Sequence, residues 1–238
     1  MNPFDPEYIL MERVTNYNQR FPSKRDYHSA ARVTSYPSVA QLMDKYGTFN
    51  HFMEAFLKTY VSVHECPLPD YLLGVLAYRA KVVHSGRRFH VRLATRDTEQ
   101  IQVLQSFAQY MQVYPSNKHK PTLYVRLYDT YLVTGLERFY TVDNSFSPTV
   151  DFVRGYIDTH SHFRIETPGR YRLTITGPLV PQCRDVLVRL GARNTRVSSV
   201  KSSFRWNIHS GSLRKIRDAL YPNGCICNER VRMMMYKA

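Results

Sequence analysis

The sequence is poor in acidic residues and in cysteine, and it lacks long apolar runs. Its 238 residues include 19 Asp and Glu against 33 Lys and Arg, which leaves a formal net charge of +14. No stretch reaches the roughly 18 apolar residues of a membrane span. The four cysteines are few for this length, and Cys225-x-Cys227 lacks the two-residue gap and the second ligand pair of a zinc site, so we expect reduced and mostly buried thiols. They are Cys66, Cys183, Cys225 and Cys227.

The usual catalytic signatures are missing as well. There is no Gly-rich phosphate loop, no His-Glu-x-x-His and no Cys-His pair with a recognisable spacing. The opening residues, Met-Asn-Pro-Phe-Asp, have neither the basic region nor the apolar region of a signal peptide, so we expect an intracellular protein. We expect no cofactor and no bound metal.

What remains is a strongly basic chain with enough apolar residues for a core. Hydrophobic residues make up 43% of the sequence. A positive charge of this size is typical of proteins that bind a polyanion, and nucleic acid is the commonest one. The alternative interpretation is an incidental basic surface.

The N-terminal part predicts a small helical domain over residues 1–66. A helix is expected at 5–19, because Asp5 can cap it and proline follows at the first helical position. A second helix is expected after Phe21. Ser38 can cap a third helix, which Gly47 ends, and Thr48 can cap a fourth. The proline-rich stretch from Pro67 to Asp70 predicts the boundary to a second domain, 67–238.

Within that second domain the order of elements repeats, with one repeat over about 70–148 and the other over about 149–238. The period is about 81 residues, taken as Gly155 minus Gly74. The predicted helices are 71–80, 97–112, 130–138, 152–160, 178–190 and 211–220. The predicted strands are 87–94, 122–128, 170–176 and a pair around 194–209.

Four of these strands alternate strictly between apolar and polar residues. A period of two places each set on its own face of a sheet. The polar sets contain arginine, histidine, asparagine, threonine and tyrosine but no carboxylate, which suits phosphates and base edges in a DNA groove. An ordinary solvated face stays open as the alternative. The candidate DNA-binding residues are Arg87, Arg88, His90, Arg92, Lys118, Lys120, Tyr124, Arg126, Arg170, Arg172, Thr174, Arg196, Lys201, Arg205 and Asn207, with Ser38, Gln41 and Lys45 from the helical domain.

Two segments carry a resemblance to a known family. "YLLGVLAYRA" (71–80) and "FVRGYIDTHSHF" (152–163) resemble the two copies of the LAGLIDADG motif of single-chain homing endonucleases. The resemblance covers about residues 68–236. Separately, "YPSVAQLMDKYGTFNHFMEAF", from Tyr36, resembles the small helical repeat that accompanies homing endonucleases as a DNA-binding accessory. The resemblance implies that the helical domain 1–66 contacts DNA flanking the segment bound by the second domain. The resemblance implies an α+β fold: a duplicated αββαββα saddle with an N-terminal helical, helix-turn-helix-like domain.

The resemblance also implies roles for individual residues. Gly74 and Gly155 are expected where the two motif helices pack against each other. In the family, one acidic residue near the end of each helix binds divalent metal ions at the cleaved phosphates. Here those positions hold Arg79 and His160. A fixed positive charge opposes a metal, and a lone imidazole poorly replaces a carboxylate for magnesium. Asp158, at an earlier acidic position of the motif, is expected to have a structural role.

These observations together predict a sequence-specific, double-stranded DNA-binding protein that derives from a homing endonuclease and no longer cuts. A transcription regulator, such as a repressor of a phage or mobile element, is the expected role. It would act as a monomer in the cytoplasm, at the nucleoid of a bacterial or phage-infected cell, with the transcription machinery or a regulatory protein as a further partner. The alternatives are an endonuclease or nickase with an unconventional metal site, an intron RNA maturase, and a different basic protein with a chance resemblance.

Overall fold

The structure is a computed structural model, and it describes residues 1–85, 88–108, 110–117, 120–141 and 146–238. The chain divides into two compact units, each of which is described by itself. Unit 1 comprises Met1–Leu68, Ala80–Ala94 and Ala108–Asn144, and unit 2 comprises Pro69–Arg79, Thr95–Phe107 and Ser145–Ala238. Each unit thus contains one sheet. The sequential domains 1–66 and 67–238 stay a prediction.

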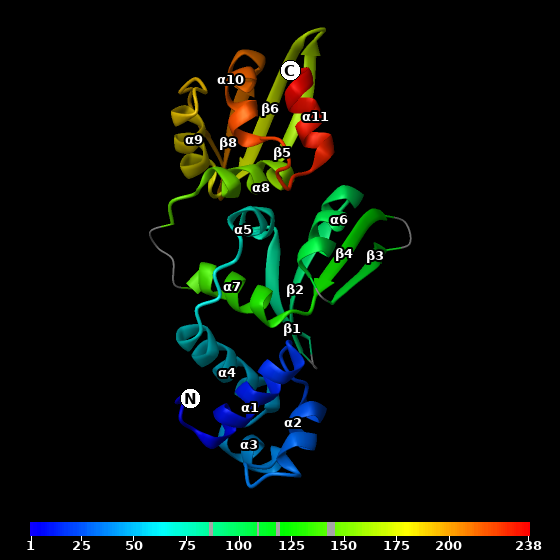
Figure 1. Ribbon diagram of the computed structural model, residues 1–238, viewed down its shortest axis with the longest axis vertical. Coiled ribbons are helices and arrows are strands. Elements are labelled where there is room, and N and C mark those ends of the chain that lie inside the picture. The colour runs from blue at the N-terminus through cyan, green and yellow to red at the C-terminus, as the bar shows by residue number, and fades with distance from the viewer. Residues whose placement is uncertain (86–87, 109, 118–119, 142–145) are drawn as a thin grey trace. The chain divides into compact units, whose positions relative to one another are not determined.

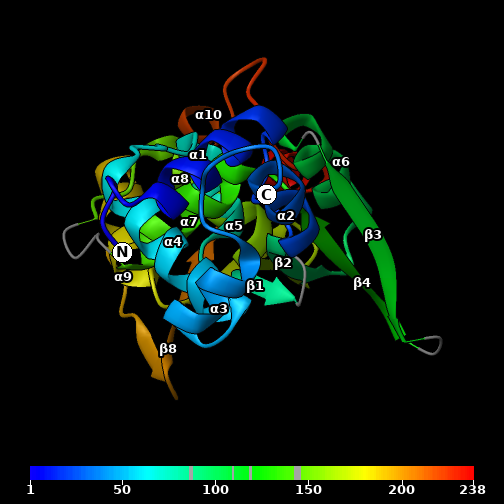
Figure 2. The ribbon, with the colours of Figure 1, turned by 90° about the horizontal axis from the view of Figure 1, so that it is seen from below.

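The N-terminal part of unit 1 consists of four helices, as predicted (Figures 1 and 2). They are α1 (Pro6–Asn18), α2 (Lys24–Ala31), α3 (Val39–Tyr46) and α4 (Phe49–Val63). The Ser38 side chain caps α3, Gly47 ends it, and Thr48 caps α4. The aromatic rings of Phe21, Phe56 and Tyr60 lie within 6.0 Å of one another and form the core of this part.

The rest of unit 1 is a four-stranded sheet with one helix. Its strands are β1 (Ala80–Ser85), β2 (Arg88–Thr95), β3 (Met111–Asn117) and β4 (Lys120–Leu127), in the order β1-β2-β4-β3. Helix α7 (Thr130–Thr141) packs against β1 and α4. The two predicted strands are the central ones. The two edge strands were not predicted, because the helices expected at 71–80 and 97–112 end early, at Leu76 and Phe107.

Unit 2 contains the second sheet and several helices, of which α8, α9 and α10 contact its strands. The strands are β5 (Ser161–Thr167), β6 (Arg170–Gly177), β7 (Ser198–Val200) and β8 (Ser203–His209), in the order β5-β6-β8-β7. Helices α9 and α10 pack against β6 and β8 (Figure 1). The helices are α5 (Asp70–Leu76), α6 (Thr98–Phe107), α8 (Val150–His160), α9 (Val180–Arg189), α10 (Ser210–Leu220) and α11 (Glu229–Lys237).

The order of elements along the chain confirms the predicted α+β class and the duplicated αββαββα pattern. The first copy runs α5-β1-β2-α6-β3-β4-α7, and the second runs α8-β5-β6-α9-β7-β8-α10, followed by α11. The apolar sides of the predicted strands are largely buried, with Val91, Val125 and Leu173 at 0% exposure. Phe204 is an exception: it was expected on the buried face but is 38% exposed. The residues opposite it, Gly177 and Ser199, have little or no side chain to cover the ring.

The centre of unit 2 is the contact between the motif helices α5 and α8. A Cβ atom added to Gly74 would collide with the carbonyl oxygen of Phe152 and lie 2.8 Å from the amide nitrogen of Tyr156. One added to Gly155 would collide with the carbonyl oxygen of Tyr71 and lie 3.0 Å from the amide nitrogen of Val75. Backbone meets backbone at both places, so no side chain can move aside. The predicted role of both glycines in helix packing agrees with this geometry.

Replacing Gly74 or Gly155 by alanine is therefore expected to lower the free energy of unfolding by about 3 kcal/mol, since the two helices must separate. Gly211→Ala is the matched control. Gly211 also lies in a helix, but an added Cβ there meets no atom within 4 Å. That variant should be neutral or stabilised by up to about 1 kcal/mol. Urea unfolding measures all three, and equal stability of the Gly74 and Gly211 variants would contradict this packing.

Candidate nucleic-acid interface

The polar face of the sheet in unit 2 is a continuous band of basic and hydrogen-bonding side chains. In β6, Arg172 and Thr174 lie opposite His209 and Asn207 of β8. Residues directly opposite in an antiparallel pair point to the same side of the sheet. The β6 polar residues also lie opposite the edge strand β5, which adds His162 opposite Thr174 and Arg164 opposite Arg172. We call this set, with Arg170 and Arg205, the unit 2 polar face.

Several arginines of this face are exposed and one is paired. Arg164, Arg170 and Arg205 are exposed. Arg172 forms an ion pair of 2.6 Å with Glu166 of β5. The four predicted strands contribute no carboxylate to their polar faces, as the sequence shows, but the edge strand β5, which was not predicted, adds Glu166 beside Arg172. Arg164 was missed for the same reason. The excess of positive charge over this single acid remains.

The sheet of unit 1 combines arginine with aromatic rings on its polar side. The guanidinium of Arg92 lies 6.0 Å from the ring centroid of Tyr124, and that of Arg126 lies 4.7 Å from the ring of Tyr114. At these distances each guanidinium is attracted to the face of the ring. Arg92 is exposed and Arg126 partly so. These four side chains form the unit 1 polar face.

His90 differs from its neighbours, because it has no exposed surface in this structure. Its ring lies 5.2 Å from that of Tyr128. Burial lowers the pKa of His90 below its ordinary value, so the ring is neutral at physiological pH. A direct contact of His90 with a nucleic acid would need the surrounding side chains to move. Alternation alone placed it correctly on the polar side but could not show what covers it.

The remaining candidates form three groups: residues that are exposed, residues whose side chains already bond within the helical part, and residues that lie outside the described ranges. Arg196 and Lys201 are exposed beside β7. Ser38 and Gln41 form the reciprocal capping box of α3, and Lys45 pairs with Glu7 at 2.6 Å, so these three already serve the helical part. Arg87 and Lys118 lie outside the described residues. Lys120 begins β4, but its side chain also lies outside them.

The ends of the two motif helices are tied together by the side chains that stand where the resemblance implies acids. Arg79 donates a hydrogen bond of 2.9 Å from Nη2 to the carbonyl oxygen of Thr159, in the last turn of α8. His160 approaches the carbonyl oxygen of Ala77, just after α5, with Nε2 at 2.8 Å. Arg79 and His160 therefore each contact the backbone at the end of the opposite helix.

Arg79 and His160 both act as hydrogen-bond donors to carbonyl oxygens at the helix ends. The last carbonyls of a helix carry partial negative charge and favour a cation or a donor. Burial lowers the pKa of His160 to about 4, so its ring is neutral. Since a carbonyl only accepts, Nε2 carries the proton. The ring also stacks on Tyr156 at 4.0 Å between centroids.

The residues at these helix ends do not fit the divalent metal ion that the resemblance implies. Magnesium and calcium prefer several oxygen ligands with negative charge. Here the two nearest carbonyl oxygens accept hydrogen bonds from protein donors, and one donor is the permanently charged guanidinium of Arg79. In the part of the chain that the structure describes, no group of three or more His, Cys, Asp or Glu side chains could hold a metal ion.

The acid that remains in the second motif, Asp158, is buried in a hydrogen-bond network. It accepts hydrogen bonds from the hydroxyls of Tyr71 (2.8 Å) and Tyr221 (2.7 Å) and from the backbone amide of Asn228 (2.7 Å). Burial raises the pKa of Asp158 to about 7, although these donors oppose the shift. Asp158 thus joins α5, α8 and the segment before α11, which agrees with the structural role expected for it.

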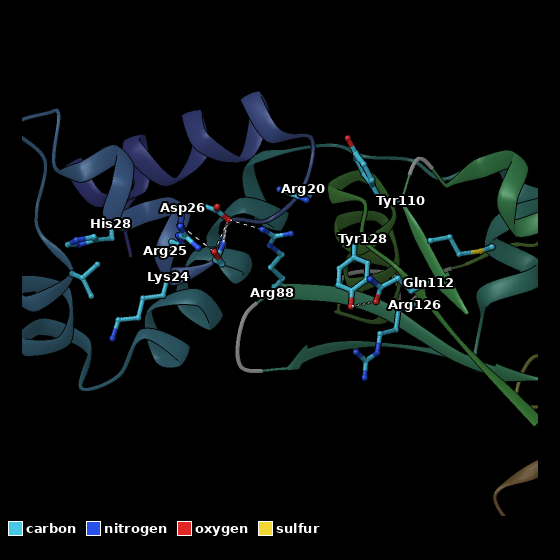
Figure 3. A pocket seen from close by; sticks show the side chains of 13 residues that line it. Arg20, Lys24, Arg25, Asp26, His28, Arg88, Tyr110, Gln112, Arg126 and Tyr128 are labelled. Carbon is cyan, nitrogen blue, oxygen red and sulfur yellow. Dashed lines mark hydrogen bonds and ion pairs between the residues drawn. The ribbon is translucent and has the colours of Figure 1, made fainter. Parts of the chain in front are cut away.

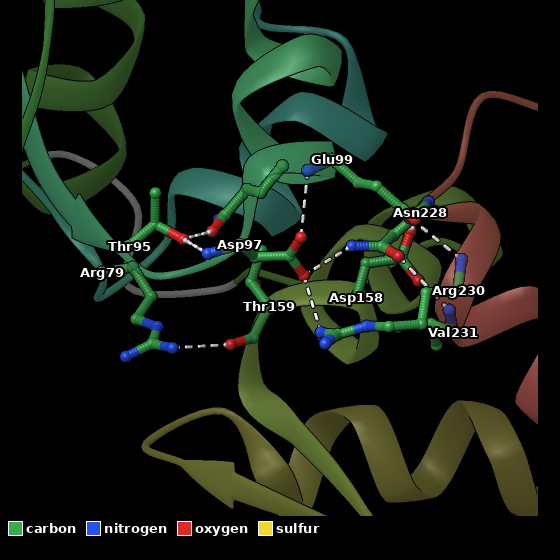
Figure 4. A network of polar contacts seen from close by, with 10 residues as sticks. Arg79, Thr95, Asp97, Glu99, Asp158, Thr159, Asn228, Arg230 and Val231 are labelled. Carbon is green, nitrogen blue, oxygen red and sulfur yellow. Dashed lines mark hydrogen bonds and ion pairs between the residues drawn. The ribbon is translucent and has the colours of Figure 1, made fainter. Parts of the chain in front are cut away.

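The network continues to residues that sequence analysis did not single out (Figure 4). The side-chain amide of Asn228 donates to Asp97 at 2.9 Å, and Arg230 pairs with the same carboxylate at 2.7 Å. Asp97 also accepts from the backbone amide of Glu99 at the start of α6. An acid followed by Thr98-Glu99 is a recognisable helix start, so its capping role could have been predicted. Its partners, over 130 positions away in sequence, could not.

Asp158 can be tested for this role by two substitutions. Asp158→Ala leaves three buried donors without an acceptor and should lower the free energy of unfolding by at least about 3 kcal/mol. Asp158→Asn keeps an amide oxygen and adds a donor for a tyrosine oxygen, so its loss should be about 1 kcal/mol. Asp185→Ala, at an exposed position of α9, is the control and should change stability by less than about 0.5 kcal/mol. Equal loss in both Asp158 variants would argue against the network.

No protein-family model matches the sequence, and no curated protein matches it. Solved structures of LAGLIDADG homing endonucleases are similar to this chain. I-DmoI in complex with DNA and Ca shares 15% identity, with a TM-score of 0.48 over 69% of this chain and 95% of that chain. The meganuclease I-CpaMI, bound to uncleaved DNA, shares 10% identity, with a TM-score of 0.49 over 71% and 89%. I-AabMI, also bound to uncleaved DNA, shares 11%, with a TM-score of 0.45 over 69% and 87%. These structures belong to the family that the two motifs resemble.

Among the described residues, none of the helices has the length and apolarity to cross a membrane.

Proposed function

We propose that this protein binds double-stranded DNA at specific sites through the unit 1 and unit 2 polar faces, and that it does not cleave the DNA. The observation that carries the proposal is the register of the second sheet, which gathers arginines, an asparagine and threonines on one side of three neighbouring strands. A sheet of basic and amide side chains offers contacts both to phosphates and to base edges. The formal charge of +14 adds attraction to any duplex.

The side chains of these faces suit the reading of bases. Arginine can donate two parallel hydrogen bonds to O6 and N7 of guanine, and asparagine can pair with adenine. Arg170 and Arg205 are exposed, and Asn207 lies on the same side, hydrogen-bonded to Thr174 at 2.8 Å. That hydrogen bond fixes the direction of the amide, which helps it to distinguish one base from another. Such contacts give specificity that phosphate contacts alone do not supply.

The lack of cleavage follows in this proposal from the helix ends. Metal-dependent hydrolysis of a phosphodiester needs ligands that hold the ion beside the attacked phosphate. Arg79 and His160 instead donate hydrogen bonds to the backbone there. A protein that binds a site and leaves it intact can act by occupying it. We therefore propose a role in transcription regulation, such as repression, which a promoter carrying the selected site would test in a reporter assay.

Cleavage can be measured directly on a supercoiled plasmid that carries a site selected from random duplexes. With either magnesium or manganese, the purified protein should shift the plasmid in a gel without converting it to the nicked or linear form. Metal-dependent nicking that disappears in a His160→Ala variant would contradict the proposal and favour a nuclease. Tighter binding to a structured intron RNA than to any duplex would favour a maturase instead.

The reading of bases can be measured with Arg170→Ala and Arg205→Ala. Each variant should lose about 1–3 kcal/mol of binding free energy on the selected duplex and far less on a scrambled duplex at the same salt concentration. Arg189→Ala and Lys215→Ala are the controls, since both residues are exposed on α9 and α10, the helices that pack on the sheet. An equal effect of all four variants on both duplexes would mean that the face contributes charge but no specificity.

A further inference from the structure

Unit 1 contains an open cleft between its helical part and its sheet (Figure 3). Its volume is about 1510 Å³. Residues of α2 and the loop before it line one side, and residues of β2, β3 and β4 line the other. None of the residues that sequence analysis assigned to DNA contact in the helical domain lines this cleft.

The charge of the lining is strongly one-sided. Its basic side chains include Arg20, Lys24 and Arg25 from the helical part and Arg88 and Arg126 from the sheet. Among the described residues of the lining, Asp26 is the one carboxylate; it accepts hydrogen bonds from Ser23 and pairs with Arg88 at 3.2 Å. These partners hold the pKa of Asp26 below its ordinary value, although burial opposes them. Asp26 therefore stays ionised and links α2 to β2 across the cleft.

The size and openness of the cleft favour a polymer over a small ligand. Pockets for small molecules typically measure about 300–1,000 Å³ and enclose most of their ligand in apolar surface. This cleft is larger and open (Figure 3). Lys24 and Arg25 are exposed at its rim. Cations spaced along an open channel match the regular negative charge of a phosphodiester backbone.

The cleft is also continuous with the unit 1 polar face. Arg126 belongs to both, because it lines the cleft and lies over the ring of Tyr114. Resting on the DNA binding proposed above, we propose that the cleft holds the sugar–phosphate backbone of duplex DNA that flanks the segment read by the unit 1 sheet. The contacts there are to phosphates, so they add affinity without base preference. Since the four N-terminal helices occur once in the chain, the extra contact arises on one flank of the site only.

The test uses the full-length protein and a selected duplex cut to its minimal length, then extended by ten base pairs on either flank. Extension on one flank should strengthen binding at least tenfold, and extension on the other should not. In the double variant Lys24→Gln/Arg25→Gln that gain should disappear, while binding to the minimal duplex stays unchanged. The slope of log K against log salt on the extended duplex should become shallower by about 2, because two phosphate contacts are lost.

Arg13→Gln/Lys58→Gln is the matched control, because it removes the same charge from exposed positions of α1 and α4 outside the cleft. It should keep the gain in affinity on one flank, and both double variants should have the melting temperature of the parent.

Two results would overturn the cleft assignment while leaving the sheet-face proposal intact: a gain in affinity that survives in Lys24→Gln/Arg25→Gln, or no gain in the parent when either flank is extended. Failure of the parent to bind any duplex would instead overturn the proposed function. Weakening of the minimal duplex by both double variants alike would show general charge attraction and also overturn the cleft assignment.

Discussion

The structure of unit 2 depends on the close approach of α5 and α8 at Gly74 and Gly155. Backbone atoms of each helix occupy the space that a Cβ atom of the other would need. This approach brings the ends of both helices within hydrogen-bond distance of each other's side chains. Arg79 and His160 can reach the opposite backbone only because the helices lie so close. The same contact places Tyr71 of α5 against Asp158 of α8.

The hydrogen bonds from Arg79 and His160 satisfy backbone carbonyl oxygens at the ends of the two motif helices. Carbonyl oxygens at helix ends need a donor, a cation or water. A guanidinium and a neutral imidazole supply two donors from within the chain. A carboxylate at either position would remove a donor and place negative charge beside an oxygen that already carries partial negative charge. The unit 1 and unit 2 polar faces consist of strand residues and do not include Arg79 or His160.

The sequence predicted those parts of the fold in which one side of an element is buried and the other is not. Central strands such as β6 alternate clearly, because Leu173 and Ile175 pack under helices while Arg172 and Thr174 face outward. Edge strand β3 contains Pro115 beside a register shift, which obscures a strand pattern. Edge strand β5 does alternate, with His162 and Arg164 on one face, but it follows α8 without an intervening turn, so its start could not be told from the end of the helix. Helix starts were recognisable from caps such as Ser38 and Thr48.

The sequence predicted which residues of the candidate site lie on the polar faces, but not which other side chains contact them. Alternation identified Arg172, yet Glu166, its ion-pair partner, came from an unpredicted strand. His90 follows the polar pattern and is nevertheless buried, because tertiary packing decides exposure. No sequence motif includes the basic residues Arg20, Lys24 and Arg25. Their position across a cleft from Arg88 is visible only in the folded structure. Alternation along a strand predicts which face of the sheet a side chain points to. It does not predict which side chains from other parts of the chain will contact it.

The most direct test of the central claim is a crystal structure of the protein on its selected duplex, grown with manganese and measured at the manganese absorption edge. The account predicts guanidinium groups of Arg170 and Arg205 at base edges, intact strands, and no anomalous peak beside the carbonyl oxygens of Ala77 and Thr159. A manganese ion coordinated at those oxygens, with Arg79 and His160 turned away and a strand cut, would contradict it.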